Sequence, residues 1–390
     1  MSPVQPPEPI LDPTGCFGLS PTFTHLNHGS VGAVPTVVQE ERQRITAELE
    51  SDPRGFFKQR GERTAAARAE CAVFLGMSEP SACFVTNVTT GVALTLHALG
   101  LVEGDEVVTT NHGYGAVDLA INAHVRAAGV VHRVASISLT PTTEEVVEAI
   151  VAELTPATKL VICDHITSAT ARLFPVRELA AQLRQRGVAL LVDAAHVPGH
   201  IDTSVSELGA DFWVGNLHKW AFAPRGCALL SVSQRWRERM RPLVTSWADP
   251  EGYPAALEFN GTDDFTGWLA SPAGPRWLQK LGIDDVRQHN SALATYGQHV
   301  LADAVGTPIA DPQPRGLAMR LVELPSGYGT TPESALWLEN EIRARLRTEL
   351  AVTSFRGRGI MRVAAQIYNT PADYERLASR LPAFLSDVAG

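Results

Sequence analysis

The chain has 390 residues, with 33 lysines and arginines against 42 aspartates and glutamates, so its net charge is −9 at pH 7. The 45% hydrophobic and 19% charged composition is that of a globular protein and excludes a disordered chain. The negative charge, without any long basic run, argues against nucleic-acid binding. Lysine is scarce and occurs only as Lys58, Lys159, Lys219 and Lys280.

Helical and strand patterns alternate through the first part of the chain. Helices are predicted at 36–75, 92–99, 116–128, 143–154 and 177–186. Short apolar runs predict strands at 82–86, 106–110, 130–134, 159–163, 188–192 and 212–215. This alternation predicts an α/β fold with a mostly parallel central sheet flanked by helices, and runs such as VALLV indicate burial on both faces.

The pattern changes after about residue 270. A long helix from 277 onward precedes strand patterns at 316–323 and 359–365 and helical patterns at 333–346 and 372–384. This predicts a second, smaller α+β domain. We therefore expect a proline-rich N-terminal arm over 1–24, a large domain over 25–270 and a small C-terminal domain over 271–390.

The cysteines and the N-terminus bear on the cellular compartment. The five cysteines are scattered without close pairs, which predicts a reduced, cytoplasmic protein and neither a disulfide framework nor a metal site. No apolar run is long enough to span a membrane. The first residues, MSPVQPPEPI, lack the positive flank and apolar core of a secretory signal.

Polar residues follow the predicted strands at the points where each strand ends. They are Thr89 and Thr90, His112, Asp164 and His165, Asp193 and His196, and His218 and Lys219. Ligands of parallel sheets bind at the carboxyl ends of the strands, so these residues are expected to line one site. Lys219 stands between a histidine and a tryptophan, and desolvation there favours its neutral, nucleophilic amine. The other three lysines lie in charged or turn contexts and are expected to reach solvent.

Two further features complete a ligand pattern. Asp193 ends a very apolar strand, where a carboxylate needs a partner such as a protonated pyridine nitrogen, although an ordinary helix cap is the other interpretation. Thr89-Thr90-Gly91 lies at a strand-to-helix turn, where hydroxyls and backbone N–H groups can bind a phosphate or simply cap the helix. The amine, the carboxylate and the phosphate site together match the three anchor points of pyridoxal phosphate.

At this point the sequence resembles the class V aminotransferase family of pyridoxal-phosphate enzymes, in the branch of isopenicillin N epimerase and cysteine desulfurase. The resemblance rests on short motifs in the family's order, at 26–35 (LNHGSVGAVP), 86–91 (TNVTTG), 165–171 (HITSATA), 193–196 (DAAH), 216–219 (NLHK), 261–263 (GTD), 361–363 (MRV) and 368–370 (YNT). It implies a fold-type I homodimer with active sites at the subunit interface. Neither the dinucleotide nor the P-loop glycine motif is present.

The resemblance also implies roles for residues around the cofactor. Lys219 would hold pyridoxal phosphate as a Schiff base and serve as the catalytic base, Asp193 would pair with the pyridine nitrogen, and His196 would lie near the ring hydroxyl. The phosphate contacts would come from Thr89, Thr90, Asn216, His218 and Thr262, the last donated by the other subunit.

The resemblance further implies residues on the substrate side. Tyr114 or His112 would cover the cofactor ring, with Tyr114 preferred. Arg362 would bind the α-carboxylate of an amino-acid substrate through its planar guanidinium. Asn27 and His165 would line the substrate site. No nucleic acid, membrane or metal partner is expected.

The type of reaction is open. Cysteine desulfurases of the family carry a nucleophilic cysteine before the carboxylate-binding arginine, but the stretch 324–361 contains no cysteine. A C–S β-lyase acting on an S-substituted cysteine, in natural-product or antibiotic biosynthesis, is our first hypothesis. Alternatives are an epimerase like isopenicillin N epimerase, with Tyr114 as the second acid, a decarboxylation-coupled oxidative deaminase of a cysteine conjugate, and an aminotransferase. In a different class, the aspartates and histidines at the strand ends could bind the metal of a hydrolase.

Overall fold

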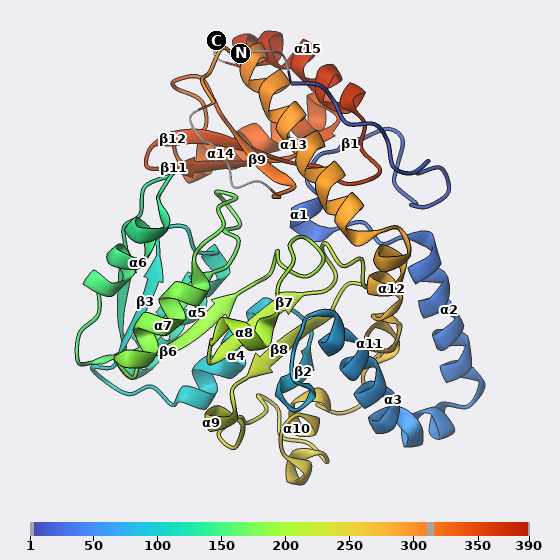
Figure 1. Ribbon diagram of the computed structural model, residues 1–390, viewed down its shortest axis with the longest axis vertical. Coiled ribbons are helices and arrows are strands. Elements are labelled where there is room, and N and C mark those ends of the chain that lie inside the picture. Colours follow the sequence, from blue (N-terminus) through green and yellow to red (C-terminus); the bar gives the residue numbers. More distant parts are fainter. Residues whose placement is uncertain (1–3, 310–315, 389–390) are drawn as a thin grey trace. The chain divides into compact units, whose positions relative to one another are not determined.

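A seven-stranded sheet forms the centre of the larger of two units in this computed structural model, which describes residues 4–309 and 316–388 (Figure 1). The larger unit comprises Val34–Ser168 and Leu173–Trp277, and the smaller one the described parts of Met1–Ala33, Ala169–Arg172 and Leu278–Gly390. The boundaries predicted from the sequence, at 24/25 and 270/271, remain our proposal for the domain organisation.

The sheet of the larger unit has the order β2-β8-β7-β6-β5-β3-β4. Its strands are β2 (Ala82–Val85), β3 (Glu106–Thr110), β4 (Val131–Ala135), β5 (Thr158–Asp164), β6 (Ala189–Asp193), β7 (Phe212–Asn216) and β8 (Ala228–Val232). The neighbours from β7 to β4 pair in parallel, while β8 is antiparallel to both β7 and β2. The sheet is therefore mostly parallel, as predicted. β8 was not predicted, because it follows β7 without an intervening helix and so breaks the strand–helix alternation.

The helices of this unit follow the predicted order. They are α2 (Thr36–Ser51), α3 (Pro53–Phe74), α4 (Val88–Leu99), α5 (Gly115–Ala128), α6 (Thr143–Ala152), α7 (Val176–Gln185), α8 (Val205–Leu208), α9 (Gln234–Arg237), α10 (Ala255–Glu258) and α11 (Thr266–Ala270), with α12 (Ala273–Lys280) at its end. The single helix predicted over 36–75 is wrong, because Asp52 caps a new helix there. Its side chain accepts from the N–H of Gly55, and Pro53 takes the first helical position.

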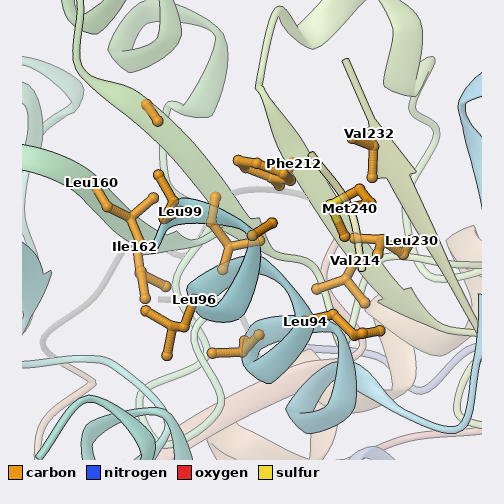
Figure 2. Packing of buried hydrophobic residues seen from close by; sticks show 14 of the residues in the cluster. Leu94, Leu96, Leu99, Leu160, Ile162, Phe212, Val214, Leu230, Val232 and Met240 are labelled. Atoms are coloured by element: carbon orange, nitrogen blue, oxygen red, sulfur yellow. The ribbon is translucent and has the colours of Figure 1, made fainter. Parts of the chain in front are cut away.

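Helix α4 packs its apolar face on the sheet and so places its N-terminus beside β7. Figure 2 shows Leu94, Leu96 and Leu99 of α4 among side chains of β5, β7 and β8, namely Leu160, Ile162, Phe212, Val214, Leu230 and Val232. The first turn lies so close to the sheet that a Cβ on Gly91 would meet Val214 Cγ2 at 2.6 Å. Glycine at this position therefore allows the helix start to approach the strand.

The smaller unit contains a three-stranded antiparallel sheet and long helices. The sheet has the order β11 (Ala351–Phe355), β12 (Arg358–Ala364) and β9 (Met319–Glu323). A parallel pair joins β1 (Thr24–His25) to β10 (Thr348–Glu349), so the N-terminal segment belongs to this unit. The helices are α1 (His28–Val31), α13 (Ile283–Val305), α14 (Pro332–Glu341), which continues into the π-helical turn η3 (Ile342–Leu346), and α15 (Pro371–Val388).

The core of the smaller unit is one apolar cluster that includes Leu293 and Leu301 of α13, Met361 and Val363 of β12, and Leu381 of α15. Contacts between α13 and α15 and between β9 and β12 dominate its packing. None of the described helices combines the length and the apolar character that crossing a bilayer requires.

Candidate active site

The carboxyl ends of three neighbouring strands bring the predicted site residues of the larger unit together. In the parallel pairing of β5 with β6, Asp164 lies opposite Asp193, and β7 ends beside them at Asn216. His196 follows β6 by three residues and Lys219 follows β7 by three residues. The strand-end positions expected from the sequence therefore form one edge of the sheet.

The amine of Lys219 lies against an imidazole whose orientation is set by a tryptophan. Lys219 Nζ is 3.3 Å from His196 Nε2, and Trp220 Nε1–H donates to His196 Nδ1 at 3.3 Å. An indole can only donate, so Nδ1 is the acceptor and a neutral His196 carries its proton on Nε2. That Nε2–H then points to Lys219, which can accept it only as a neutral amine. Trp220 was not among the predicted site residues.

The indole that orients His196 is itself held in place. The ring of His200 stacks on Trp220 with centroids 4.1 Å apart, and His200 Nδ1 lies 3.0 Å from the backbone carbonyl of His196. All three residues are almost fully buried. The loop after β6 and the segment after β7 are thus joined through one packed group, which restricts the rotamer of His196.

Asp193 is buried and keeps one carboxylate oxygen available. Its Oδ1 accepts from the N–H of Ala195 at 3.0 Å, while for Oδ2 no hydrogen bond is found within the part of the chain that is described. Burial raises the pKa of Asp193, and the Ala195 N–H and the charge of Lys219 act in the opposite direction. A cationic N–H donor at Oδ2 would stabilise the ionised carboxylate, as expected for a pyridinium partner.

A second carboxyl lies beside Asp193. Asp164 is its cross-strand neighbour, is also buried, and has its pKa raised by burial first and by the negative charge of Asp193 second. Both carboxyls are buried at neighbouring strand ends and burial raises the pKa of each, so ionisation of one disfavours ionisation of the other. The sequence placed Asp164 among the strand-end residues expected to line one site, but the only chemical role considered for it was as a metal ligand of the alternative hydrolase.

The start of α4 offers hydrogen-bond donors of the kind that bind phosphate. Asn87 caps the helix through the N–H of Thr90 at 2.9 Å, and Asn216 Oδ1 accepts the N–H of Val88 at 3.1 Å. The N–H and the exposed hydroxyl of Thr89 remain available, as does the side-chain NH₂ of Asn216. The hydroxyl of Thr90 instead bonds within the turn, to Thr86 Oγ1 at 2.8 Å. Of the two threonines, Thr89 is better placed to bind an anion.

His218 and Thr262 differ in how strongly the structure constrains them. His218 Nδ1 donates to the carbonyl of Cys227 at 2.9 Å. The pKa of His218 is lowered to about 4, chiefly by burial, with the hydrogen bond to Cys227 acting in the opposite direction and the charge of Lys219 lowering it further. The neutral ring keeps a lone pair on Nε2. Thr262 is exposed in the loop between α10 and α11. Its predicted contact with the other subunit remains a prediction.

The three aromatic and histidine candidates after β3 and β5 have different surroundings. His112 is buried, with Nε2 3.0 Å from the carbonyl of Ser138 and its ring edge-on to Phe174. Tyr114, just before α5, is 48% exposed. His165 is buried, and burial lowers its pKa to about 4. Because the interior holds the ring of His112, Tyr114 is the better candidate to cover a ligand.

Arg362 and Asn27 form a contact within the smaller unit. Arg362 lies in the central strand β12 between Ala351 and Leu321, and its Nη2 donates to Asn27 Oδ1 at 2.8 Å. Burial lowers the pKa of this guanidinium to about 10, so it remains charged at neutral pH. A buried, charged guanidinium is suited to a carboxylate partner, because pairing compensates its desolvation.

These residues fit the three groups of pyridoxal phosphate. Lys219 offers an amine for the aldehyde, Asp193 an accepting oxygen for the pyridine nitrogen, and the first turn of α4 offers donors for the phosphate. A metal centre is not formed by the same histidines and aspartates. Over residues 4–309 and 316–388, no group of three or more His, Cys, Asp or Glu side chains could hold a metal ion.

Comparison with known proteins gives consistent matches over nearly the whole chain. Residues 30–377 match the profile of the family described as Aminotransferase class-V. Isopenicillin N epimerase of Streptomyces clavuligerus is 30% identical over 387 residues, covering 95% of this chain and 96% of the relative. L-cysteine desulfhydrase of Arabidopsis thaliana is 28% identical over 398 residues, covering 93% and 88%. A solved structure of a C-DES mutant, with glycine covalently linked to its PLP cofactor, superposes with a TM-score of 0.82 at 20% identity, covering 95% of this chain and 99% of that one.

Proposed function

The chain belongs to the class V aminotransferase family of pyridoxal-phosphate-dependent enzymes, and we propose that it cleaves the C–S bond of an S-substituted cysteine by β-elimination. Bound pyridoxal phosphate supplies a ring that accepts the electron pair left at Cα when a proton is removed. The L-cysteine desulfhydrase among its relatives supports C–S cleavage. The sequence 324–361, which lacks a cysteine, supports elimination over transfer of sulfur to the enzyme.

The observation that carries this proposal is the position of the Lys219 amine at the carboxyl edge of the sheet, beside His196. Lys219 Nζ is held beside His196 Nε2 and can take the proton from Cα as a neutral amine. The Cβ–S bond then breaks with its electron pair on sulfur, which takes a proton and leaves as a thiol. Hydrolysis of the released 2-aminoacrylate consumes one water and yields pyruvate and ammonia. This sequence needs one base and no second acid opposite it.

Other side chains would bind and orient the substrate. Arg362, buried and charged, would bind the α-carboxylate, with Asn27 fixing the guanidinium plane through its 2.8 Å hydrogen bond. Asp193 would keep the pyridine nitrogen protonated by pairing with it. Tyr114 would cover the ring, and His165 would line the substrate side.

The direct test measures both products. Purified protein loaded with pyridoxal phosphate is incubated with S-methyl-L-cysteine, and thiol and pyruvate are quantified together. Equal amounts of both are expected from the wild type and neither from Lys219→Ala. Lys159→Ala is the matched control, because Lys159 is an exposed lysine of β5 paired with Asp105. If S-substituted cysteines yield neither thiol nor pyruvate, the lyase proposal is wrong.

Epimerisation at Cα is the second candidate, supported by the 30% identical isopenicillin N epimerase. It would require an acid on the face opposite Lys219, for which Tyr114 is the candidate. The same incubations in D₂O distinguish the two reactions. Exchange at Cα with inversion, without thiol release, favours the epimerase, and Tyr114→Phe should then abolish inversion while retaining exchange.

A homodimer with shared sites is part of the same proposal. If the partner subunit's Thr262 completes each phosphate site, inactive Lys219→Ala and Thr262→Ala chains should complement one another when mixed. Half of the dimers would be mixed and each would hold one complete site, so about a quarter of the wild-type activity should return. No recovery would show that each site is built from one chain.

We also propose that the protein works in a reducing compartment such as the cytoplasm. All five cysteines are free, and four of them, Cys71, Cys83, Cys163 and Cys227, are buried. Burial raises the pKa of each of these four thiols, which keeps them protonated and unreactive. Cell fractionation tests this assignment.

A further inference from the structure

A cavity lies within the smaller unit. The residues that line it come from the N-terminal and the C-terminal parts of the chain. It has a volume of about 420 Å³ and is lined by the N-terminal segment 13–25, the end of η3, and residues 368–380 around the start of α15. Cavities of this size hold small organic molecules. None of the residues assigned above to the cofactor or the substrate lines it.

Part of the cavity lining is apolar. Phe17, Leu19 and Phe23 of the N-terminal segment face it together with Leu346 and the ring of Tyr368. The rings of Phe17 and Tyr368 meet edge-on with centroids 5.1 Å apart. Tyr368 is further fixed by the hydrogen bond between its hydroxyl and His28 Nδ1, at 3.0 Å. These contacts form a preformed aromatic wall.

The lining also includes three arginines, Arg347, Arg376 and Arg380. Arg380 is held by two backbone carbonyls of η3, at 3.1 Å and 3.0 Å. Arg347 donates to the carbonyl and hydroxyl of Thr22, at 3.3 Å and 3.1 Å, and its guanidinium carbon lies 3.7 Å from the centre of the Phe23 ring. Both guanidinium groups keep further N–H donors, so they are positioned before any ligand binds.

The charges at the cavity do not balance. Among the residues that the structure describes, three arginines line it, and Asp373 is the only carboxylate that does. Asp373 is also engaged locally, because it pairs with Arg376 at 2.5 Å and accepts the N–H of Thr370 at 2.9 Å. The positive excess therefore remains facing the cavity, next to the aromatic wall.

We propose that this cavity binds an organic anion, a small molecule in which an aromatic or aliphatic body carries a phosphate or carboxylate group. The apolar wall would bury the body, and the arginines would form charge-assisted, bidentate hydrogen bonds to the anionic group. The proposal does not depend on the reaction at Lys219, because every residue that it uses lies in the smaller unit.

Calorimetric titration of the holoenzyme, free of excess cofactor, tests the site with phenyl phosphate as the probe. Phenol supplies the body without the charge, inorganic phosphate the charge without the body, and benzoate replaces phosphate by carboxylate. We expect phenyl phosphate to bind at one site per chain, at least about tenfold more tightly than phenol or inorganic phosphate. Benzoate shows which anionic group the arginines prefer.

Variants locate the binding. Arg376→Gln removes a surface guanidinium from α15. Arg347→Gly removes a second guanidinium, at a position whose backbone φ of +54° is one that glycine adopts without strain. Each should weaken phenyl phosphate binding about tenfold. The control is Arg345→Gln. Arg345 lies in η3, pairs with Asp387 of α15, and does not line the cavity. Arg362→Leu should also leave binding unchanged.

Three results would overturn the assignment. They are no measurable binding of phenyl phosphate to the wild type, equal binding of phenyl phosphate and phenol, or unchanged binding in both Arg376→Gln and Arg347→Gly. Thermal unfolding of each variant confirms that it is folded. Since the two arginines come from different segments, the loss of one variant to misfolding leaves the other to decide.

Discussion

The buried imidazole of His165 should make the folded protein less stable as the pH falls from 8 to 5.5. His165 is only 7% exposed, and its Nδ1 has no hydrogen-bond partner among residues 4–309 and 316–388. Burial lowers its pKa from 6.5 to about 4. Between these two values the unfolded chain binds the proton and the folded chain does not, so stability rises with pH through this window and is lost as the pH falls.

The magnitude follows from the two protonation states. At pH 8 the imidazole is neutral in both the folded and the unfolded protein. At pH 5.5, about nine in ten unfolded imidazoles are protonated, while the folded one stays neutral. The folding free energy contributed by this group is then lower by about 1.4 kcal/mol than at pH 8. The size of this loss depends mainly on the pKa of the imidazole in the unfolded chain, because the folded pKa of about 4 lies well below pH 5.5.

Urea unfolding of the apoprotein at the two pH values measures the effect. The fluorescence of the buried Trp213 and Trp220 reports on the larger unit, which contains His165. His165→Gln stays neutral at both pH values, so its packing cost cancels in the comparison. The unfolding free energy of His165→Gln minus that of the wild type should be about 1.4 kcal/mol larger at pH 5.5 than at pH 8.

The control for this experiment is His97→Gln, which removes an exposed histidine of α4. This substitution should not reproduce the gain at low pH, because solvent surrounds that ring in both states. If the free-energy difference between His165→Gln and the wild type is the same at pH 5.5 and pH 8, His165 is not held neutral by burial, and the reasoning is refuted.

Three more predictions concern the site and its support. Trp220→Phe removes the indole N–H that donates to His196 Nδ1, so we expect a loss of about 1 kcal/mol in unfolding free energy and a lower kcat with little change in KM, measured with S-methyl-L-cysteine. Gly91→Ala places a Cβ 2.6 Å from Val214 Cγ2 and should lower the unfolding free energy by about 1–3 kcal/mol, and an unchanged urea midpoint would contradict this packing. His218 is neutral with a lone pair on Nε2, so a phosphate bound there should raise its pKa, and cofactor affinity measured by absorbance should increase from pH 8 to pH 6.

The chemistry-bearing residues of the larger unit could be predicted because they follow strands. A parallel sheet brings every carboxyl end to one edge, so the positions of Asp193 and Lys219 after apolar runs were enough to predict that they meet. Lysine occurs only four times, and Lys219 is the one that follows an apolar strand between a histidine and a tryptophan, which singled it out as the candidate amine. The motifs in order along the chain then indicated the family.

Hydrogen-bond roles and burial could not be predicted in this way. The donor that orients His196 comes from Trp220, which was not among the predicted site residues, and Asp164 was given no role beside Asp193 although both end apolar strands. His112 and Tyr114 are two residues apart and were both candidates to cover the ring, with Tyr114 preferred, and the structure places the His112 ring inside the fold and leaves Tyr114 exposed.

The sequence by itself determined the order of most elements and the mostly parallel sheet, and it singled out a candidate amine, acid and phosphate-binding turn, because these depend on local patterns along the chain. Only the tertiary structure decided what each of these groups touches. Strand β8, the juxtaposition of Asp164 with Asp193, and a cavity formed by residues more than three hundred positions apart all arise from pairing across the chain. Such pairing depends on packing and register, which no local pattern encodes.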